Sequence, residues 1–482
     1  MLPASVGIGS GCGPQEVEDP SVAYRTCSDQ EPCAEGAECV FGLCVAECPG
    51  APVTEESRAC TEGLVCWEDG CRAECDDAHP CTQAYSCVAG RCEYRPCEHP
   101  EFWSKSLASA SYPVLVHYRD DAELESARAI VGALEQSWQF ETESLGFLPP
   151  VSDQSTCGPD DGFDVFVWRT FRGGVADVIA EEPSTAWNDY RAYVIVDPWG
   201  PYGGENLEPF VAHELNHSMQ AAYDWYETPI FFEMTSQFVE EVVYDGADDY
   251  RDYFYDYQGN PDWAFDYNDN YQTSYFYGAS LYLFYLRDGV FGGEPSFISE
   301  IWDRSRNPAG ENEPDFEDAL ESVLQQRHGV SFQDTLIEFA RWRYFTGARD
   351  DGRHFEEGST FPENALVKIE QRHRVANMAL EIPGPMLLGT QYIQLYREAG
   401  DPSQVTLSFD GEAGVHWVVQ AVPGLAPDSD GELLDFSSGT AQLDFGALEE
   451  RSLVVLALPK GADDPDTRDD TRHPYTISVS VP

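Results

Sequence analysis

The distribution of cysteines constrains the fold of this chain more than any other feature of its sequence. Thirteen of the 15 cysteines lie between Cys27 and Cys97, and twelve of these form three tandem sets of four. The sets are Cys27, Cys33, Cys39 and Cys44; Cys48, Cys60, Cys66 and Cys71; and Cys75, Cys81, Cys87 and Cys92. The first and third sets have identical spacing, and the second carries an insertion after its first cysteine. Residues 27–97 are therefore predicted to form three small repeated modules.

These cysteines are better explained by disulfides than by bound metal. The close C-x-x-C pairs typical of zinc modules do not occur in the sets. We therefore predict two disulfides in each module, and an oxidising, extracytoplasmic compartment for the chain. The sequence does not fix the connectivity within a module. Cys97 and Cys157 are left over and are predicted to pair with each other. The modules resemble EGF-like or related extracellular repeats.

The first residues carry a cysteine that has no partner in this count. Cys12 follows the small residues Gly9, Ser10 and Gly11, a pattern that loosely resembles the motif before a bacterial lipoprotein cysteine. The stretch lacks the basic region of a complete signal peptide. We interpret residues 1–26 as a signal remnant and linker. A lipid anchor at Cys12 is one interpretation, and a stray cysteine in an unstructured terminus is the other.

The charge of the chain argues against a nucleic-acid partner, and its hydropathy argues against a transmembrane segment. The chain has 86 acidic and 28 basic residues, a formal net charge of −58. Such a surface repels phosphate backbones, so no nucleic-acid partner is expected. No run of 18 apolar residues occurs, so no transmembrane segment is predicted. Together with the cysteines, this favours a secreted protein or a bacterial cell-surface lipoprotein.

The pattern of hydrophobic residues changes twice after Cys97. Residues 98–370 mix strands and amphipathic helices, which predicts an α+β domain. Strands are expected at 112–118, 163–168 and 193–196, and helices at 121–145, 207–224, 229 onward, 274–287, 315–326 and 331–345. Residues 380–482 contain short alternating segments between turns rich in Gly, Pro and Asp. This second pattern predicts a β-sandwich of about 100 residues. The predicted fold class is multidomain.

One motif in the α+β domain carries chemistry. Residues 213–217 are His-Glu-Leu-Asn-His. On a helix, His213 and His217 lie one turn apart on one face, where both imidazoles can bind one zinc ion. Glu214 lies beside the first histidine and can reach a water at the metal without binding the metal itself. A chance occurrence is the alternative, and the preceding apolar strand and the Pro209 helix start make it less favourable.

A catalytic zinc site needs a third protein ligand and one open position. The metzincin pattern would place Gly at 220 and His at 223, but the chain has Gln220 and Tyr223. The next helix begins at Pro229 and carries Glu233 on an apolar face, where an acid must be paired or bind metal. Glu233 is therefore the predicted third ligand. Glu240 and Glu241, further along that helix, are expected to be solvated.

These residues resemble the gluzincin clan, and in particular a group of secreted bacterial zinc-peptidase-like proteins. In that group the Glu ligand is usually followed by Gly, whereas this chain has Met234. The stretches Tyr277–Leu281 and Phe339–Trp342 also agree, and the resemblance covers about residues 108–365. It implies a zincin-like domain with a mainly helical lower lobe. Tyr277 would donate to the oxyanion, although a buried aromatic core residue is the alternative.

The implied activity is hydrolysis of a protein or peptide substrate by zinc-activated water, with Glu214 as general base. Asp224 and Gln237 are candidate acceptors for the second ring nitrogens of the zinc-binding histidines. A non-catalytic surface or adhesion protein on the same scaffold is the main alternative. A zinc hydrolase of non-peptide substrates is another.

Calcium is a weaker candidate cofactor. The segment 245–270 is rich in Asp and Tyr, and it includes Asp266 and Asp269. Oxygen ligands of this kind suit calcium, but the segment lacks EF-hand spacing. A solvated acidic loop is therefore the favoured interpretation.

Overall fold

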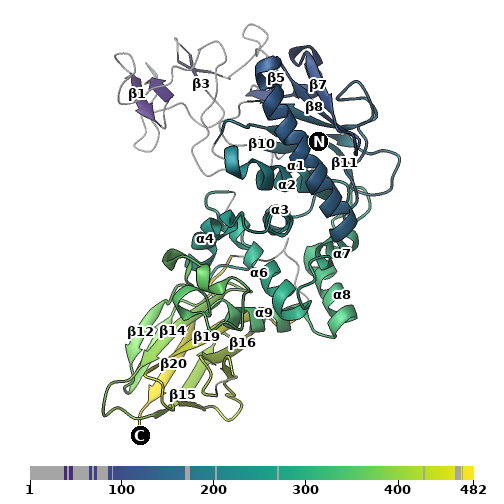
Figure 1. Ribbon diagram of the computed structural model, residues 1–482. Helices are drawn as coiled ribbons and strands as arrows, with labels where there is room; N and C mark the ends of the chain where they lie inside the picture. The colour runs from purple at the N-terminus through teal and green to yellow at the C-terminus, as the bar shows by residue number, and fades with distance from the viewer. Residues whose placement is uncertain are drawn as a thin grey trace. The chain divides into compact units, whose positions relative to one another are not determined.

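The computed structural model describes residues 95–168, 174–200, 203–268, 271–426, 429–461, 468 and 470–482, together with six short strands before residue 95. The chain is multidomain and contains helices and several β-sheets (Figure 1). It divides into two compact units. One unit comprises Gly13–Arg128 and Ser152–Trp168, and the other comprises Met1–Cys12, Ala129–Val151 and Arg169–Pro482.

The six early strands form three antiparallel hairpins, one in each predicted module. The strands are β1 (Ala37–Val40), β2 (Leu43–Ala46), β3 (Val65–Trp67), β4 (Gly70–Arg72), β5 (Tyr85–Val88) and β6 (Arg91–Tyr94). In every hairpin the third and fourth cysteines of a set are directly opposite: Cys39 and Cys44, Cys66 and Cys71, and Cys87 and Cys92. Each repeat of the cysteine pattern therefore contains the same β-hairpin. Disulfide pairing within the modules depends on side chains outside the described part of the chain, as does the interpretation of Cys12.

The smaller unit also contains three longer strands. They are β7 (Lys105–Ala108), β8 (Val114–Tyr118) and β9 (Phe163–Val167), and β8 pairs antiparallel with β7 and parallel with β9. The residues of β8 and β9 are buried throughout, as their apolar composition predicts. Cys97 and Cys157 form a disulfide, which confirms the predicted pairing and joins the end of the modules to the segment before β9.

In the larger unit, an antiparallel strand pair precedes the helices that carry the motif. The strands are β10 (Gly174–Glu181) and β11 (Tyr190–Val196), and the helices are α2 (Leu207–Gln220) and α3 (Pro229–Val243). Pro229 is the first residue of α3, as predicted, because its fixed φ suits that position. The preceding Thr228 has extended backbone, and its hydroxyl makes no capping hydrogen bond.

Seven further α-helices are described, and they range from four to 16 residues. Helix α1 (Leu124–Gln139) continues into a π-helical turn, Phe140–Leu145, which ends at Gly146 with φ +83°. The others are α4 (Phe254–Gly259), α5 (Tyr275–Gly278), α6 (Ser280–Tyr285), α7 (Phe297–Arg304), α8 (Phe316–His328) and α9 (Phe332–Trp342). The predicted helix 274–287 is thus divided into α5 and α6, and α7 was not predicted. Across the described residues, no helix has both the length and the apolarity needed to span a bilayer.

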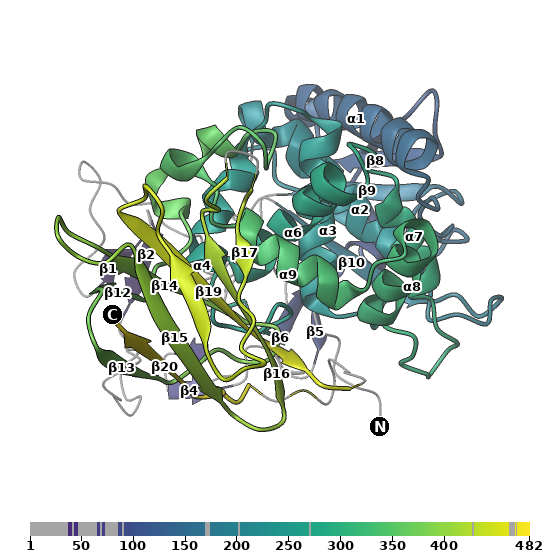
Figure 2. The same ribbon diagram turned by 90° about the horizontal axis from the view of Figure 1, so that it is seen from below.

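The C-terminal residues form two β-sheets, as the alternating pattern predicts (Figure 2). One sheet has the order β12-β14-β19-β16-β17 and the other β13-β20-β15-β18. The strands are β12 (Gln371–Arg374), β13 (Met378–Ile382), β14 (Thr390–Tyr396), β15 (Gln404–Gly411), β16 (Val415–Val422), β17 (Glu432–Leu433), β18 (Ala441–Asp444), β19 (Glu450–Pro459) and β20 (Tyr475–Ser480). Inward-facing residues of both sheets share one core, which includes Leu395, Leu407, Val455 and Ile477. The sandwich begins at β12, before residue 380, because β12 pairs with β14.

The sandwich is anchored to the helices of the same unit. The Tyr392 hydroxyl donates to the Ala340 carbonyl at 2.6 Å, and the Gln420 amide donates to the Ile337 carbonyl at 2.8 Å. Both carbonyls belong to α9, which lies beside β16 and β19 in both views (Figures 1 and 2). At Gly389, an added Cβ would lie only 2.7 Å from the Trp263 carbonyl oxygen, so a side chain there would disrupt this docking.

Candidate metal centre

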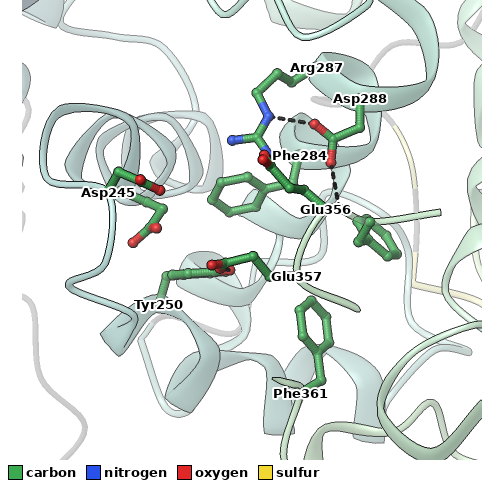
Figure 3. Close-up of a pocket in the computed structure, with 10 residues that line it drawn as sticks. Asp245, Tyr250, Phe284, Arg287, Asp288, Glu356, Glu357 and Phe361 are labelled. Carbon is green, nitrogen blue, oxygen red and sulfur yellow. Dashed lines mark hydrogen bonds and ion pairs between the residues drawn. The ribbon is translucent and has the colours of Figure 1, made fainter. Parts of the chain in front are cut away.

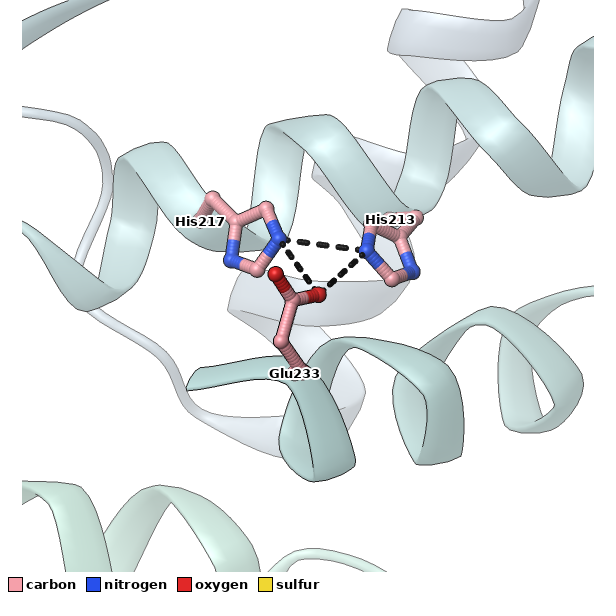
Figure 4. A group of neighbouring side chains, drawn as sticks. All are labelled: His213, His217 and Glu233. Carbon is pink, nitrogen blue, oxygen red and sulfur yellow. Dashed lines mark hydrogen bonds and ion pairs between the residues drawn. The ribbon is translucent and has the colours of Figure 1, made fainter. Parts of the chain in front are cut away.

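Helices α2 and α3 bring the three predicted ligands together. His213 and His217 lie on one face of α2, and Glu233 of α3 points between them (Figure 4). The two Nε2 atoms are 3.1 Å apart, and they lie 3.3 and 3.4 Å from Glu233 Oε2. Ligands bound at about 2.0–2.1 Å to a tetrahedral zinc are about 3.3 Å from one another. The three donor atoms therefore already have the separations that a tetrahedral zinc requires.

The second ring nitrogen of each histidine fixes which nitrogen faces the cluster. His213 Nδ1 lies 3.2 Å from Glu240 Oε2, and His217 Nδ1 lies 2.9 Å from Gln220 Oε1. A carboxylate and an amide oxygen only accept hydrogen bonds, so both Nδ1 atoms donate. When both imidazoles are neutral, each Nε2 lone pair faces Glu233, and the cluster then contains three acceptors. A cation at this point satisfies all three, and two imidazoles with a carboxylate suit zinc.

The electrostatics of the cluster also favour positive charge. Burial lowers the pKa of His213, but the hydrogen bonds and charges of Glu233 and Glu240 outweigh burial and raise that pKa well above its usual value. Burial raises the pKa of Glu233, but the charge of His217 and hydrogen bonds from both histidines bring it down to about 2. The buried cluster of His213, His217 and Glu233 therefore stabilises a cation, whether a proton or a metal ion.

Glu214 lies in α2 next to His213 and is almost fully buried. Burial raises its pKa; the nearby His217 and His213 lower it, Glu233 raises it, and the Ala176 peptide N–H lowers it through a hydrogen bond. Glu214 is thus close enough to interact with every member of the ligand cluster. Because Ala176 belongs to β10, this carboxyl lies between the cluster and that strand.

Tyr277 lies beside the same cluster. It belongs to α5, and its ring centroid is 6.1 Å from that of His213 and 5.0 Å from that of Tyr253. The Tyr277 hydroxyl is buried and has no hydrogen-bond partner among the described residues. Burial and the charges of Glu233 and Glu214 raise the pKa of Tyr277 well above its usual value, so the phenol remains protonated. It is therefore a free donor at the site.

The expectation that Glu240 and Glu241 are solvated is wrong, because α3 is enclosed on all sides and both side chains are buried. Glu240 is instead the acceptor for His213. Gln237, predicted as a histidine partner, donates to Glu240 at 3.1 Å. The spacing of Glu240 from Glu233, two helical turns along one face, is the sequence signal that would have identified it.

Asp224 was the other predicted partner of a zinc-binding histidine. Its carboxylate accepts from the Tyr226 peptide N–H at 2.8 Å, and none of its hydrogen bonds within the described chain goes to a histidine. Burial raises the pKa of Asp224 to about 6. The partners of His217 Nδ1 are instead Gln220 Oε1 at 2.9 Å and the Ser236 hydroxyl at 3.1 Å.

In the described part of the acidic segment after α3, Asp248 and Asp266 pair with different arginines. Asp266 forms an ion pair with Arg468, and Asp269 lies outside the described residues. Carboxylates of Glu241, Asp248 and Glu357 do converge. Glu241 and Glu357 also line a pocket together with Tyr250, Phe284 and Arg287 (Figure 3). However, Arg251 pairs with both Asp248 and Glu357. Calcium binding therefore stays a prediction.

Comparison with known proteins adds little to this description. No protein-family model matches the chain, and no curated protein matches its sequence. Among solved structures, one that it resembles is the pre-peptidase C-terminal domain of a collagenase from Bacillus anthracis. The match covers 97% of that domain and 23% of this chain, with 14% identity and a TM-score of 0.17. At that TM-score the similarity carries no argument about function.

Proposed function

We propose that this protein is an extracytoplasmic zinc-dependent peptidase of the gluzincin kind, with His213, His217 and Glu233 as metal ligands. The observation that carries the proposal is the convergence of three acceptor atoms within 3.4 Å, with the Glu214 carboxyl beside them. A zinc scaffold without activity has no use for a carboxyl at that position.

The residues around the cluster suit hydrolysis of an amide. A zinc ion bound by these ligands would supply Lewis-acid activation of water and of the scissile carbonyl. Glu214 accepts the proton of the attacking water and returns it to the leaving amine. The Tyr277 hydroxyl donates to the oxyanion that develops on the substrate carbonyl.

Strand β10 supports a peptide as substrate. Among the described strands β10 pairs only with β11, which makes it an edge strand of that sheet. The Ala176 N–H of β10 reaches Glu214, which places this strand beside the catalytic groups. An extended peptide can bind an open strand edge through main-chain hydrogen bonds. A small ester or sugar substrate would not need such an edge.

The proposal predicts chelator-sensitive proteolysis. The purified protein should hydrolyse casein, lose that activity after treatment with a zinc chelator, and recover it when zinc is returned. Release of casein fragments, followed with and without the chelator, measures this. Bound zinc without cleavage of casein or of mixed peptides would instead favour a scaffold role.

Replacement of Tyr277 by Phe should lower kcat by about 100-fold, because removal of one oxyanion donor costs 10²–10³ in rate. KM should change little, since the aromatic ring and its packing remain. The measurement is steady-state hydrolysis of a fluorogenic peptide. The matched control is Tyr253→Phe, which removes the hydroxyl of a tyrosine whose ring packs against that of Tyr277. An unchanged kcat in Tyr277→Phe would assign this residue to the aromatic core.

A further inference from the structure

A chain of buried amides leads from His217 to a glutamate far away in the sequence. His217 Nδ1 contacts Gln220 Oε1 at 2.9 Å, and the Gln220 amide donates to Asn216 Oδ1 at 2.8 Å. The Asn216 amide in turn donates to Glu141 Oε2 at 2.9 Å. All four side chains are buried. This series of hydrogen bonds is therefore shielded from solvent over its whole length, from His217 to Glu141.

Only one assignment of donors and acceptors satisfies this series of hydrogen bonds. The Gln220 amide nitrogen also donates to the Phe232 carbonyl at 3.0 Å, which can only accept, and to the Ser236 hydroxyl at 3.1 Å. Gln220 Oε1 must therefore face His217, and His217 must carry its proton on Nδ1. In that tautomer the Nε2 lone pair faces the metal position.

Glu141 is the last residue of this series of hydrogen bonds, and it orients the Asn216 amide. It lies in the π-helical turn that follows α1, and such turns are frequent at functional sites. Asn216 provides its one described hydrogen bond, and Glu141 Oε1 has no partner among the described residues. A buried carboxyl without a cation costs stability. Burial also raises the pKa of Glu141 well above its usual value, so its useful feature is an acceptor oxygen and not its charge.

We propose that Glu141 is a positioning residue for the metal centre, acting through Asn216 and Gln220 to hold His217 in the metal-binding tautomer and orientation. The proposal rests on the proposed zinc site. Loss of outer partners of a metal-binding histidine typically weakens metal affinity 10- to 100-fold. Glu141 and Gln220 should therefore affect zinc affinity through one shared path.

The test measures the zinc dissociation constant of the full chain by competition with a chelator. Glu141→Met removes the acceptor, Gln220→Met removes the contact with His217, and each should weaken zinc binding about tenfold. The double variant should bind zinc no more weakly than Gln220→Met alone, because residues of one network are not additive. Glu141→Gln keeps an acceptor oxygen and should retain wild-type affinity. Glu143→Met, an exposed residue of the same π-helical turn, is the control.

Several results would overturn the positioning role. Wild-type affinity in folded Glu141→Met, additive losses in the double variant, or a loss in Glu141→Gln equal to that in Glu141→Met would each do so. If Glu141→Met does not fold, Glu141→Gln and Gln220→Met decide: the first must bind zinc normally and the second weakly. Absence of zinc binding in the wild-type protein is a different result, which overturns the proposed function itself.

Discussion

Replacement of Glu214 by Gln is expected to lower kcat for peptide hydrolysis by about a thousand-fold, within the 10²–10⁴ typical of general acid–base catalysis. Gln has the same shape as Glu but cannot accept the proton of the attacking water. Because Glu214 is not among the three converging metal ligands, zinc content and thermal stability should remain close to wild type. Hydrolysis of a fluorogenic peptide and metal analysis of the same sample measure both expectations.

Glu143→Gln is the matched control, because Glu143 is an exposed glutamate whose described hydrogen bond goes to Gln139 and not to the site. It should hydrolyse the peptide at the wild-type rate. Comparable turnover in Glu214→Gln and Glu143→Gln would exclude Glu214 as the base. Loss of zinc from Glu214→Gln would contradict a role for Glu214 as base alone, since it would make Glu214 part of the ligand set.

Replacement of Glu233 by Ala should remove most of the bound zinc. Glu233 supplies the one carboxylate of the ligand set, and its loss removes the α3 oxygen that faces the two Nε2 atoms. The zinc affinity should fall by more than about 100-fold, the upper end of what loss of an outer partner costs. The measurement is the zinc content after dialysis against a weak chelator.

Glu241→Ala is the control for this variant. Glu241 is a second buried glutamate of α3, but its carboxylate contacts the peptide N–H groups of Gly246 and Asp248. Zinc content should be unchanged in Glu241→Ala. Full zinc occupancy in Glu233→Ala would remove Glu233 from the ligand set and leave the third ligand to another residue.

The parts of the structure that the sequence predicted are those with strong local signals. The spacing of His213 and His217 and the helix start at Pro229 define α2 and α3 without any long-range information. The pairing of Cys97 with Cys157 followed from counting cysteines outside the repeats. Continuous apolar runs likewise predicted β8 and β9.

The parts that were not predicted depend on contacts between distant segments. Strand β10 has a mixed composition and becomes a strand through its pairing with β11. Glu240 was expected in solvent because surface helices have a polar face, but α3 packs against α2 on one side and against α5 and α6 on another. No local pattern connects Glu141 with Asn216, since the two residues meet only in the folded chain.

The decisive measurement for the zinc site is metal analysis of the purified wild-type protein beside Glu233→Ala. We expect one tightly bound zinc per wild-type chain, retained through dialysis, and little zinc in the variant. Wild-type protein that takes up no zinc, even when zinc is supplied during purification, would contradict the proposed metal centre and the peptidase activity that depends on it.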